Sequence, residues 1–342
     1  MKEKRGFVLG GTLIVDHVKI IDLYPTEGTL AIILESSKGI GGCPTNNSVN
    51  LKILDPELPV AVMGRIGDDE NGRYVLDTLQ KRQIETHAVT ISPDKPTSYT
   101  DVMTVEKTGH RTFFHDRGAN AEWTIDHIPF EAFSPYKIAQ IGYILLLDAM
   151  DAADSEYGTV MARAFARFQQ MGIKTAVDVV SESSDRFNRL VIPALKYVDY
   201  LILNELEAGQ TVRIPLRHDD GTLRGTLLRE VAEKLLDAGN SELVVIHMPE
   251  GGYALTRQGE EVKVPSFLLD DHDIKGSVGA GDAFCSGVLY GLEKDMPLQE
   301  TLHLGSTLAA CSLFSPTATG GALSLAEARQ KMSHYALRPL LF

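Results

Sequence analysis

Short apolar runs alternate with segments of helical period over most of the chain. From about residue 121 onward the runs have the length of buried strands, and the intervening segments repeat apolar positions every three or four residues. We predict strands at 138–147, 175–180, 200–204 and 243–246, a hairpin at 253–264, and helices at 161–171, 227–238, 298–314 and 325–335. This alternation is typical of an α/β protein with a doubly wound, mostly parallel sheet and helices on both faces.

The amino-terminal third has a different pattern. Residues 7–15 are almost continuously apolar and predict one buried strand that Asp16 closes, at the edge where open α/β sheets bind ligands; the alternative is that Asp16 only caps a turn. A helix is expected at 73–83. The segments 18–38 and 97–115 are β-rich, with turn residues and no helical period, which favours a small separate sheet over extra edge strands of the main one. We therefore expect a main α/β domain formed by 1–16, 40–95 and 121–342, and a β-rich lid formed by 17–39 and 96–120.

The stretch 276–292 predicts a glycine loop that leads directly into a helix. Small residues recur four apart at Ala283, Gly287 and Gly291, so one face of that helix must pack closely against a neighbour. The first-turn N–H groups of a helix lack intrahelical partners and favour an anion. Asp282 lies in this turn, where it could accept a proton from a hydroxyl that attacks a bound phosphate. The alternative is an acid that only suits the helix dipole.

Polar residues also follow several predicted strands. They are Asp16, Asp148, Asp178, Asn204, Glu205 and Glu207. Because parallel strands end at one edge of a sheet, we expect these side chains to converge there. Asn204 and Glu207 offer oxygen ligands for Mg²⁺ or its waters, although acids in the first turn of a solvated helix would look the same. Gly41 and Gly42, just before a helix that contains Asn46, would let the backbone approach a ligand.

Composition narrows the class of partner. The 342 residues carry a net charge of -13, which argues against nucleic acid or an anionic membrane as the main partner. Three scattered cysteines indicate free thiols in a reducing cytoplasm, and we see no apolar run long enough for a membrane helix. The P-loop pattern and the G-x-G-x-x-G pattern after the first strand are both absent.

Several motifs in order give the chain a resemblance to a known family. Gly64-Arg-Ile-Gly-Asp-Asp-Glu-Asn-Gly72 and Gly279-Ala-Gly-Asp-Ala-Phe284 resemble the two signatures of the ribokinase-like, PfkB-type carbohydrate kinases. Gly41-Gly-x-x-x-Asn46 and Asn204-x-x-Glu207 match at the expected spacing. The resemblance spans nearly the whole chain and implies transfer of the ATP γ-phosphoryl group to a sugar hydroxyl.

The resemblance also implies roles for individual residues. Asp282 would be the catalytic base, next to an anion hole formed by Gly279, Ala280 and Gly281. Asn204, Glu207 (through water), Gly252 and Ser277 would bind the nucleotide and its Mg²⁺. The hydroxyls of the sugar would be bound by Asp16, Gly41, Gly42 and Asn46. Arg111, His115 and Arg117 in the lid could recognise a carboxylate or phosphate on an acidic substrate, or could be ordinary surface cations.

Two departures from the family pattern limit these expectations. Gly276, Ser277 and Val278 replace the common Asp-Thr-Thr, so the sequence gives no support for activation by a monovalent cation. His247-Met-Pro249 replaces a Thr-x-Gly near the nucleotide. The main hypothesis is an ATP-dependent sugar kinase that dimerises through its lid. Its rivals are a kinase for a nucleoside or sugar phosphate, and a non-catalytic sugar- or nucleotide-binding regulator.

Overall fold

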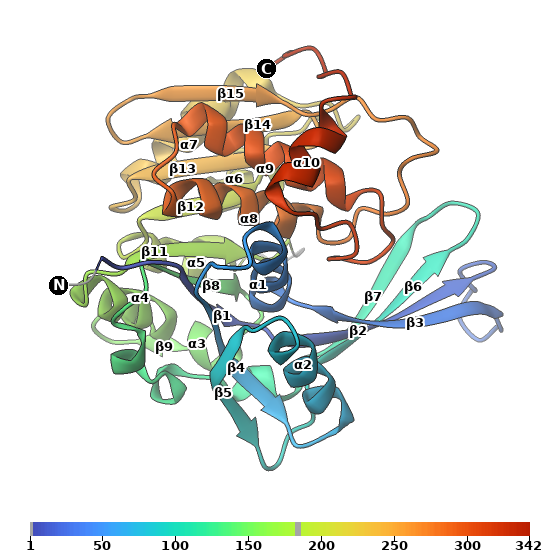
Figure 1. Cartoon of the computed structure of the whole chain (residues 1–342), viewed down its shortest axis with the longest axis horizontal. Helices are drawn as coiled ribbons and strands as arrows, with labels where there is room; N and C mark the ends of the chain where they lie inside the picture. The colour runs from blue at the N-terminus through green and yellow to red at the C-terminus, as the bar shows by residue number, and fades with distance from the viewer. Residues whose placement is uncertain (1–2, 182–185) are drawn as a thin grey trace.

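The computed structural model describes residues 3–181 and 186–342, which form a main sheet covered by helices and a smaller sheet that projects from it (Figure 1). The main sheet has the strand order β15-β14-β13-β12-β11-β8-β1-β4-β5. Its strands are β1 (Phe7–Gly11), β4 (Val60–Gly67), β5 (Glu85–Ser92), β8 (Ile138–Ile144), β11 (Lys174–Val179), β12 (Tyr200–Asn204), β13 (Leu243–Met248), β14 (Gly251–Thr256) and β15 (Glu261–Pro265). All neighbours from β5 to β13 are parallel, and the predicted hairpin supplies the antiparallel β14 and β15.

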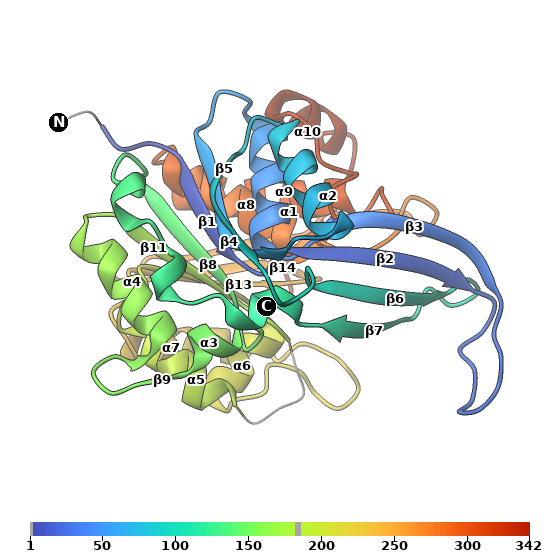
Figure 2. The same ribbon diagram turned by 90° about the horizontal axis from the view of Figure 1, so that it is seen from below.

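Helices cover both faces of this sheet (Figure 2). One face carries α1 (Cys43–Leu54), α2 (Glu70–Gln80), α8 (Ala280–Glu293), α9 (Leu298–Ser312) and α10 (Leu325–Met332). The other carries α3 (Asp148–Asp151), α4 (Val160–Gln170), α5 (Phe187–Leu195), α6 (Glu205–Val212) and α7 (Leu228–Asp237). A separate hydrophobic core lies under each layer, as expected for a doubly wound sheet. No helix in the described part of the chain combines the length and the apolar character needed to cross a membrane.

Short elements connect these layers. A two-stranded ribbon is formed by β9 (Ala153–Asp154) and β10 (Gly158–Thr159). Single turns of 3-10 helix are η1 (Gly118–Glu122), η2 (Ile125–His127), η3 (Phe130–Phe133) and η4 (Gly225–Leu227).

The second sheet consists of strands from the two β-rich regions and is the predicted lid. Its order is β3 (Ile33–Gly41), β2 (Ile14–Ile21), β6 (Tyr99–Val105) and β7 (Arg111–Asp116). β2 and β3 extend slightly beyond the expected lid range 17–39 at both ends. Asp69, in the first signature-like segment, caps α2 and also accepts hydrogen bonds from the backbone and hydroxyl of Thr97, both at 2.7 Å. This segment therefore fastens the base of the lid to the main sheet.

Two predicted strands were wrong in extent. The apolar run 7–15 is not one strand, because β1 ends at Gly11 and β2 begins at Ile14 in the other sheet. Gly11 has φ +131° and lies so close to Gly142 that no side chain fits, so the chain leaves the main sheet there. Asp16 is consequently a residue of β2 and does not close a strand of the main sheet. Likewise, β8 ends at Ile144, and Asp148 begins α3 with a half-exposed carboxylate paired to Arg117.

The close packing predicted for the helix after the glycine loop is confirmed. α8 lies against α9, and a Cβ placed on Gly287 would come within 2.7 Å of the Gly305 backbone. A Cβ on Gly291 would come within 2.5 Å of the Thr301 hydroxyl. Only the small residues on this face allow the two helices to approach so closely.

Candidate active site

Asp282 lies in the first turn of α8, buried, and two side chains hold its carboxylate. The Asn46 amide donates to Oδ2 at 2.8 Å, and the Tyr143 hydroxyl donates to Oδ1 at 2.9 Å. Asn46 comes from α1 and Tyr143 from β8, so three elements converge on one acid. Burial raises the pKa of Asp282, while both hydrogen bonds oppose that shift. Burial and the neighbouring Asp282 raise the pKa of Tyr143, which therefore stays protonated and able to donate.

The backbone at the start of α8 is open to an anion. Gly279 precedes the helix at φ +75°, and a Cβ there would come within 2.6 Å of the Ala318 carbonyl, so glycine is required. No side chain in the described part of the chain caps this end of the helix. Among the described residues, the structure gives no hydrogen-bond partner to the amides of Gly281 and Asp282. Unpaired amides at the positive end of a helix dipole form an anion-binding site.

Lid residues reach the same region from the other side. Asp16, Thr100 and His115 form one row across β2, β6 and β7. Thr100 Oγ1 and His115 Nδ1 are 3.0 Å apart. Any side chain at Gly41 would collide with the Asp16 carboxylate, so the glycine lets this acid pack against β3. Burial, and then the charge of Asp282, raise the pKa of Asp16 to about 6.

Several buried polar atoms around this acid pair lack a partner. They are Thr12 Oγ1, Asn46 Oδ1 and His115 Nε2, none of which has a hydrogen bond in the described part of the chain. Buried polar groups are normally satisfied, so unpaired ones mark a place where a polar ligand can bind. The hydroxyls of a sugar would supply such partners. Of the predicted acceptor-binding residues, the structure thus brings together Asp16, Gly41, Asn46 and His115, with Gly42 at the N-cap of α1.

A cavity of about 520 Å³ opens beside the start of α8. Its polar end includes Asn204, His247, Ser277, Ala280 and Gly281. The other walls are mainly apolar and are formed by Phe267, Leu269, Phe284, Ala309, Ala310 and Leu313. Ser306 also lines it, and the Ser306 hydroxyl is buried without a partner among the described residues. An anion site together with apolar walls suits a nucleotide, and we name this space the nucleotide cavity.

Asn204 and Glu207 form a capping box at the start of α6. Asn204 Oδ1 accepts the amides of Leu206 and Glu207, both at 2.9 Å, and Glu207 Oε2 accepts the Asn204 amide at 3.0 Å. Glu207 Oε1 accepts from Ser181 and from the Asn204 side chain, both at 2.7 Å. Glu207 is only 4% exposed, so it is not the solvated first-turn acid considered as an alternative. The pair fixes how Asn204 faces the nucleotide cavity.

The buried acids near this edge of the sheet repel one another. Burial, followed by the charges of Glu207 and Asp282, raises the pKa of Asp178 well above its ordinary value. Burial raises the pKa of Glu207 to about 7. Carboxylate oxygens of Asp178 and Asp282 lie within 4.8 Å of each other and of the Cys43 thiol, and carboxylate oxygens are ligands that Mg²⁺ prefers. The donor set is therefore compatible with Mg²⁺.

Other predicted residues lie further from Asp282. Arg111 is on β7, its guanidinium lies against Gly276, and the structure assigns it no ion pair or hydrogen bond with any described residue. Gly252 is on β14 beside His247, where a Cβ would come within 2.9 Å of the Phe284 ring. Asp148, expected at the sheet edge, instead pairs with Arg117 as described above. The sequence analysis did not predict Tyr143 as a site residue. The one indication in the sequence was a tyrosine hydroxyl near the end of a predicted strand.

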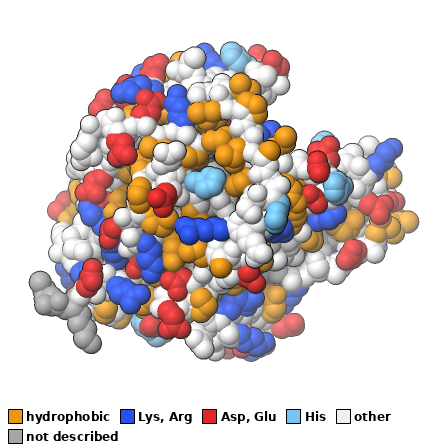
Figure 3. Space-filling view, turned by 45° about the horizontal axis from the view of Figure 1, so that its top comes forward, with side chains coloured by type: hydrophobic (Ala, Val, Ile, Leu, Met, Phe, Trp, Pro, Cys, Tyr) orange, Lys and Arg blue, Asp and Glu red, His pale blue; other side chains and the backbone are white. Residues whose placement is uncertain are grey.

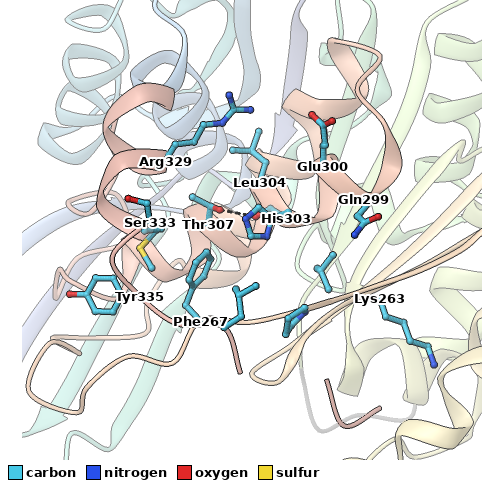
Figure 4. A pocket seen from close by; sticks show the side chains of 14 residues that line it. Lys263, Phe267, Gln299, Glu300, His303, Leu304, Thr307, Arg329, Ser333 and Tyr335 are labelled. Carbon is cyan, nitrogen blue, oxygen red and sulfur yellow. Dashed lines mark hydrogen bonds between the residues drawn. The ribbon is translucent and has the colours of Figure 1, made fainter. Parts of the chain in front are cut away.

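A second hollow lies on another side of α9 and is distinct from the site. It has a volume of about 630 Å³ and is lined by residues of β15, α9 and α10, including Lys263, His303 and Arg329 (Figure 4). Phe267 lines both this hollow and the nucleotide cavity. None of the predicted site residues lines the second hollow.

Solved structures define the class of fold. The chain matches a ribokinase of Arabidopsis thaliana complexed with ribose and ATP with a TM-score of 0.78, at 16% identity, over 96% of this chain and 98% of that chain. It matches a nucleoside kinase of Methanocaldococcus jannaschii with a TM-score of 0.72, at 15% identity, over 97% and 99% of the two chains. The fold is therefore that of the ribokinases.

The family follows from the sequence comparison. Residues 12–324 match the model of the pfkB family of carbohydrate kinases, so the chain belongs to this family and is a sugar kinase, a phosphotransferase with an alcohol acceptor. An uncharacterized sugar kinase of Archaeoglobus fulgidus is 24% identical over 255 residues, which cover 74% of this chain and 90% of the relative. A 5-dehydro-2-deoxygluconokinase of Geobacillus thermodenitrificans is 24% identical over 345 residues, which cover 98% and 95%. The predicted family and fold class are thus confirmed.

Proposed function

We propose that this sugar kinase transfers the γ-phosphoryl group of ATP to a hydroxyl of a sugar or sugar derivative, with Asp282 as the general base. The observation that carries the proposal is the position of Asp282. It is a buried carboxylate held by Asn46 and Tyr143 in the first turn of a helix whose Gly281 and Asp282 amides are unpaired. In-line transfer needs this combination, because a proton must leave the attacking hydroxyl while charge accumulates on the phosphoryl oxygens.

The proposed site has two parts, the nucleotide cavity and the acceptor side, and each is formed by different residues. In the nucleotide cavity, apolar walls hold the base. The anion hole of Gly279, Ala280 and Gly281 presents the unpaired Gly281 amide to the transferred phosphoryl group, while the Ala280 amide bonds to the Ser277 carbonyl at 3.4 Å. Ser277 lies at the polar end of the same cavity. Glu207, through water, and Asn204 would hold Mg²⁺, which would supply positive charge to the phosphates.

On the acceptor side, Asp16, Asn46 and His115 offer hydrogen-bonding groups to the hydroxyls of the sugar, with Gly41 and Gly42 allowing close approach of the backbone. Asp282 then takes the proton from the hydroxyl that attacks. Asn46 and Tyr143 keep the carboxylate oriented by occupying both of its oxygens. The row of Asp16, Thr100 and His115 belongs to the lid, so we propose that the lid covers the acceptor and excludes water.

Arg111 gives a reason to include acidic sugars among the candidates. Its guanidinium is half-buried in the lid and has no partner among the described residues, so it is available to an anion. Burial lowers the pKa of Arg111. Curated relatives are named 5-dehydro-2-deoxygluconokinase, and a keto-deoxy sugar acid therefore belongs in the substrate panel.

The test is a coupled kinase assay with Mg²⁺ and ATP across pentoses, hexoses, keto-deoxy sugar acids, nucleosides and sugar phosphates. We expect one sugar or sugar acid to be phosphorylated, and Asp282→Asn to lower kcat by at least about 1,000-fold with an unchanged melting temperature. Near-normal turnover by Asp282→Asn would overturn the assignment of the base. Transfer to a nucleoside or sugar phosphate alone would favour the rival kinase, and binding of ATP and sugar with no transfer would favour a regulator.

A further inference from the structure

The second hollow, of about 630 Å³, is formed by β15, α9 and α10 and takes no part in the proposed phosphoryl transfer. Its lining includes the apolar side chains of Val264, Phe267, Leu304 and Met332, each of which is at most 7% exposed. These buried side chains form an apolar floor. A hollow of this volume has the size of a binding site for a small molecule.

The rim of the second hollow carries an excess of positive charge. Figure 4 shows Arg329 of α10 and Lys263 of β15 on opposite sides of the hollow, with His303 of α9 between them. Among the described residues that line the hollow, these two permanent cations face one acid, Glu300. Such a rim attracts an anion, although the chain as a whole has a net charge of -13.

Two of the rim side chains are available to a ligand. Within 3–181 and 186–342, the structure gives no hydrogen bond or ion pair to the guanidinium of Arg329 or to the ring nitrogens of His303. Burial, and then the charge of Arg329, lower the pKa of His303, so its imidazole is neutral near neutral pH and carries one N–H donor. Arginine binds a carboxylate through two parallel N–H groups, and the His303 N–H adds a further donor.

Aromatic rings meet at the same place. The rings of Phe267 and His303 have centroids 5.6 Å apart and planes at 44°. Tyr335 also lines the hollow, and its hydroxyl donates to Asp273 at 3.0 Å, which fixes the position of its ring. A flat aromatic ligand can pack against such rings over the apolar floor.

We propose that the second hollow binds a small aromatic carboxylate. Its ring lies on the apolar floor beside Phe267 and Tyr335, and its carboxylate accepts hydrogen bonds from Arg329 and His303. The positive rim selects an anion over a neutral molecule of the same shape, because only the anion gains the charge-assisted hydrogen bonds.

The second hollow shares walls with the nucleotide cavity. Phe267 lines both spaces, and α9 contributes Leu304 and Thr307 to the hollow and Ser306 and Ala310 to the cavity. A ligand that shifts Phe267 or α9 therefore changes the affinity of the nucleotide cavity, and ATP changes the affinity of the hollow by the same factor. This link rests on the proposed function, because it requires a nucleotide in the cavity, whereas binding to the hollow does not.

Calorimetry with 2-naphthoate tests the site, and 2-naphthamide, with the same ring system and no charge, is the matched ligand. We expect the wild type to bind 2-naphthoate at least about tenfold more tightly, and Arg329→Gln to remove most of this preference. Ser333→Trp, at an exposed residue of the rim, fills the hollow and should abolish binding of both ligands. Arg189→Gln removes an exposed arginine of α5 on the other face of the main sheet and should bind as the wild type does.

Equal affinity of the wild type for the two ligands, or a full preference for 2-naphthoate in Arg329→Gln, would overturn the proposal. So would binding that survives Ser333→Trp, because the ligand would then lie elsewhere on the molecule.

The link to the nucleotide cavity is measured separately. Kd for ATP with Mg²⁺ should change at least about fivefold when 2-naphthoate is saturating, and Ser333→Trp should remove this change. An unchanged Kd for ATP in the wild type would overturn the link. A wild type that binds 2-naphthoate but no ATP would contradict the proposed function while confirming the site in the second hollow.

Discussion

Asp16, which we propose binds the acceptor, lies in an environment that is unfavourable for a charged carboxylate. Burial, and then Asp282, raise its pKa from 3.8 to about 6. The folded pKa exceeds the unfolded value, so this group stabilises the fold fully below about pH 4, and the stabilisation is lost as the pH rises through 6. We predict that Asp16→Asn leaves the free energy of unfolding almost unchanged at pH 4 and raises it by up to about 3 kcal/mol at pH 8.

Urea unfolding of the wild type and Asp16→Asn at pH 4, 6 and 8 measures this difference. Asp94→Asn, at an exposed carboxylate, is the control and should show no such pH dependence. The variant should also raise KM for the acceptor, because an amide cannot accept as a charged carboxylate does. Equal stability of the two proteins at pH 8 would show that Asp16 is not held in a costly ionised state.

The positions of single site residues can be predicted from sequence where they depend only on neighbouring residues. Gly279 and Asp282 follow from a glycine loop that opens a helix, and the structure places them as that rule requires. Tyr143 could not be assigned in the same way, because its hydrogen bond to Asp282 joins residues 139 positions apart. No local pattern encodes which strand end will meet which helix.

At the scale of elements, the junction between the glycine loop and α8 determines where the Gly281 and Asp282 amides lie. Gly279 needs φ +75° and has the Ala318 backbone within 2.7 Å of any added Cβ. Gly279→Ala would therefore move the loop and misplace the Gly281 and Asp282 amides. We predict a fall in kcat of at least about 100-fold, measured in the coupled assay with the best acceptor.

Gly259→Ala is the matched control for this prediction. Gly259 has φ +91° in the turn between β14 and β15, with nothing within 4 Å of the added Cβ. It should lose about 1 kcal/mol of stability from the backbone conformation alone and keep normal kcat. If both variants retain full turnover, the loop geometry does not matter for phosphoryl transfer.

The errors among the elements share one physical cause. Residues 7–15 form one apolar run and predict a single strand. Ile14 and Val15 are as buried as Phe7 to Leu9, so the run does reflect burial. Hydrophobic pattern reports burial, and burial cannot show that the chain passes from one sheet to another. The β-rich lid segments were recognisable because their turn residues interrupt any helical period.

For the whole molecule, the lid presents apolar surface that is unusual for an isolated chain. Large exposed side chains gather on it, namely Leu23, Tyr24, Leu30, Ile32, Ile33, Leu34, Phe113 and Phe114, and hydrophobic atoms are visible at its outer end in Figure 3. β3 is an edge strand, exposed over 33–38. Open edges and apolar faces of sheets tend to be covered, so we propose a homodimer through the lid.

Light scattering at micromolar concentration tests the dimer. The wild type should have twice the mass of the chain, and Ile33→Lys on β3 should have the mass of a monomer. Ile91→Lys is the control, because Ile91 is similarly exposed at 53% but lies on the far edge strand β5 of the main sheet. A wild-type monomer, or dissociation by both variants alike, would contradict dimerisation through the lid.

Hydrophobic periodicity and a few short motifs were enough to establish the fold class, the lid and the place of Asp282, because each depends on residues close together in the chain. The assembly of the site required the folded molecule. The contacts of Asn46 and Tyr143 with Asp282, the packing of the Asp16 carboxylate against Gly41, and the ring of His247 beside Gly281 all join distant segments. The strand order and register of the parallel sheet decide such contacts, because they determine which strand ends and which helix starts meet at one edge of the sheet.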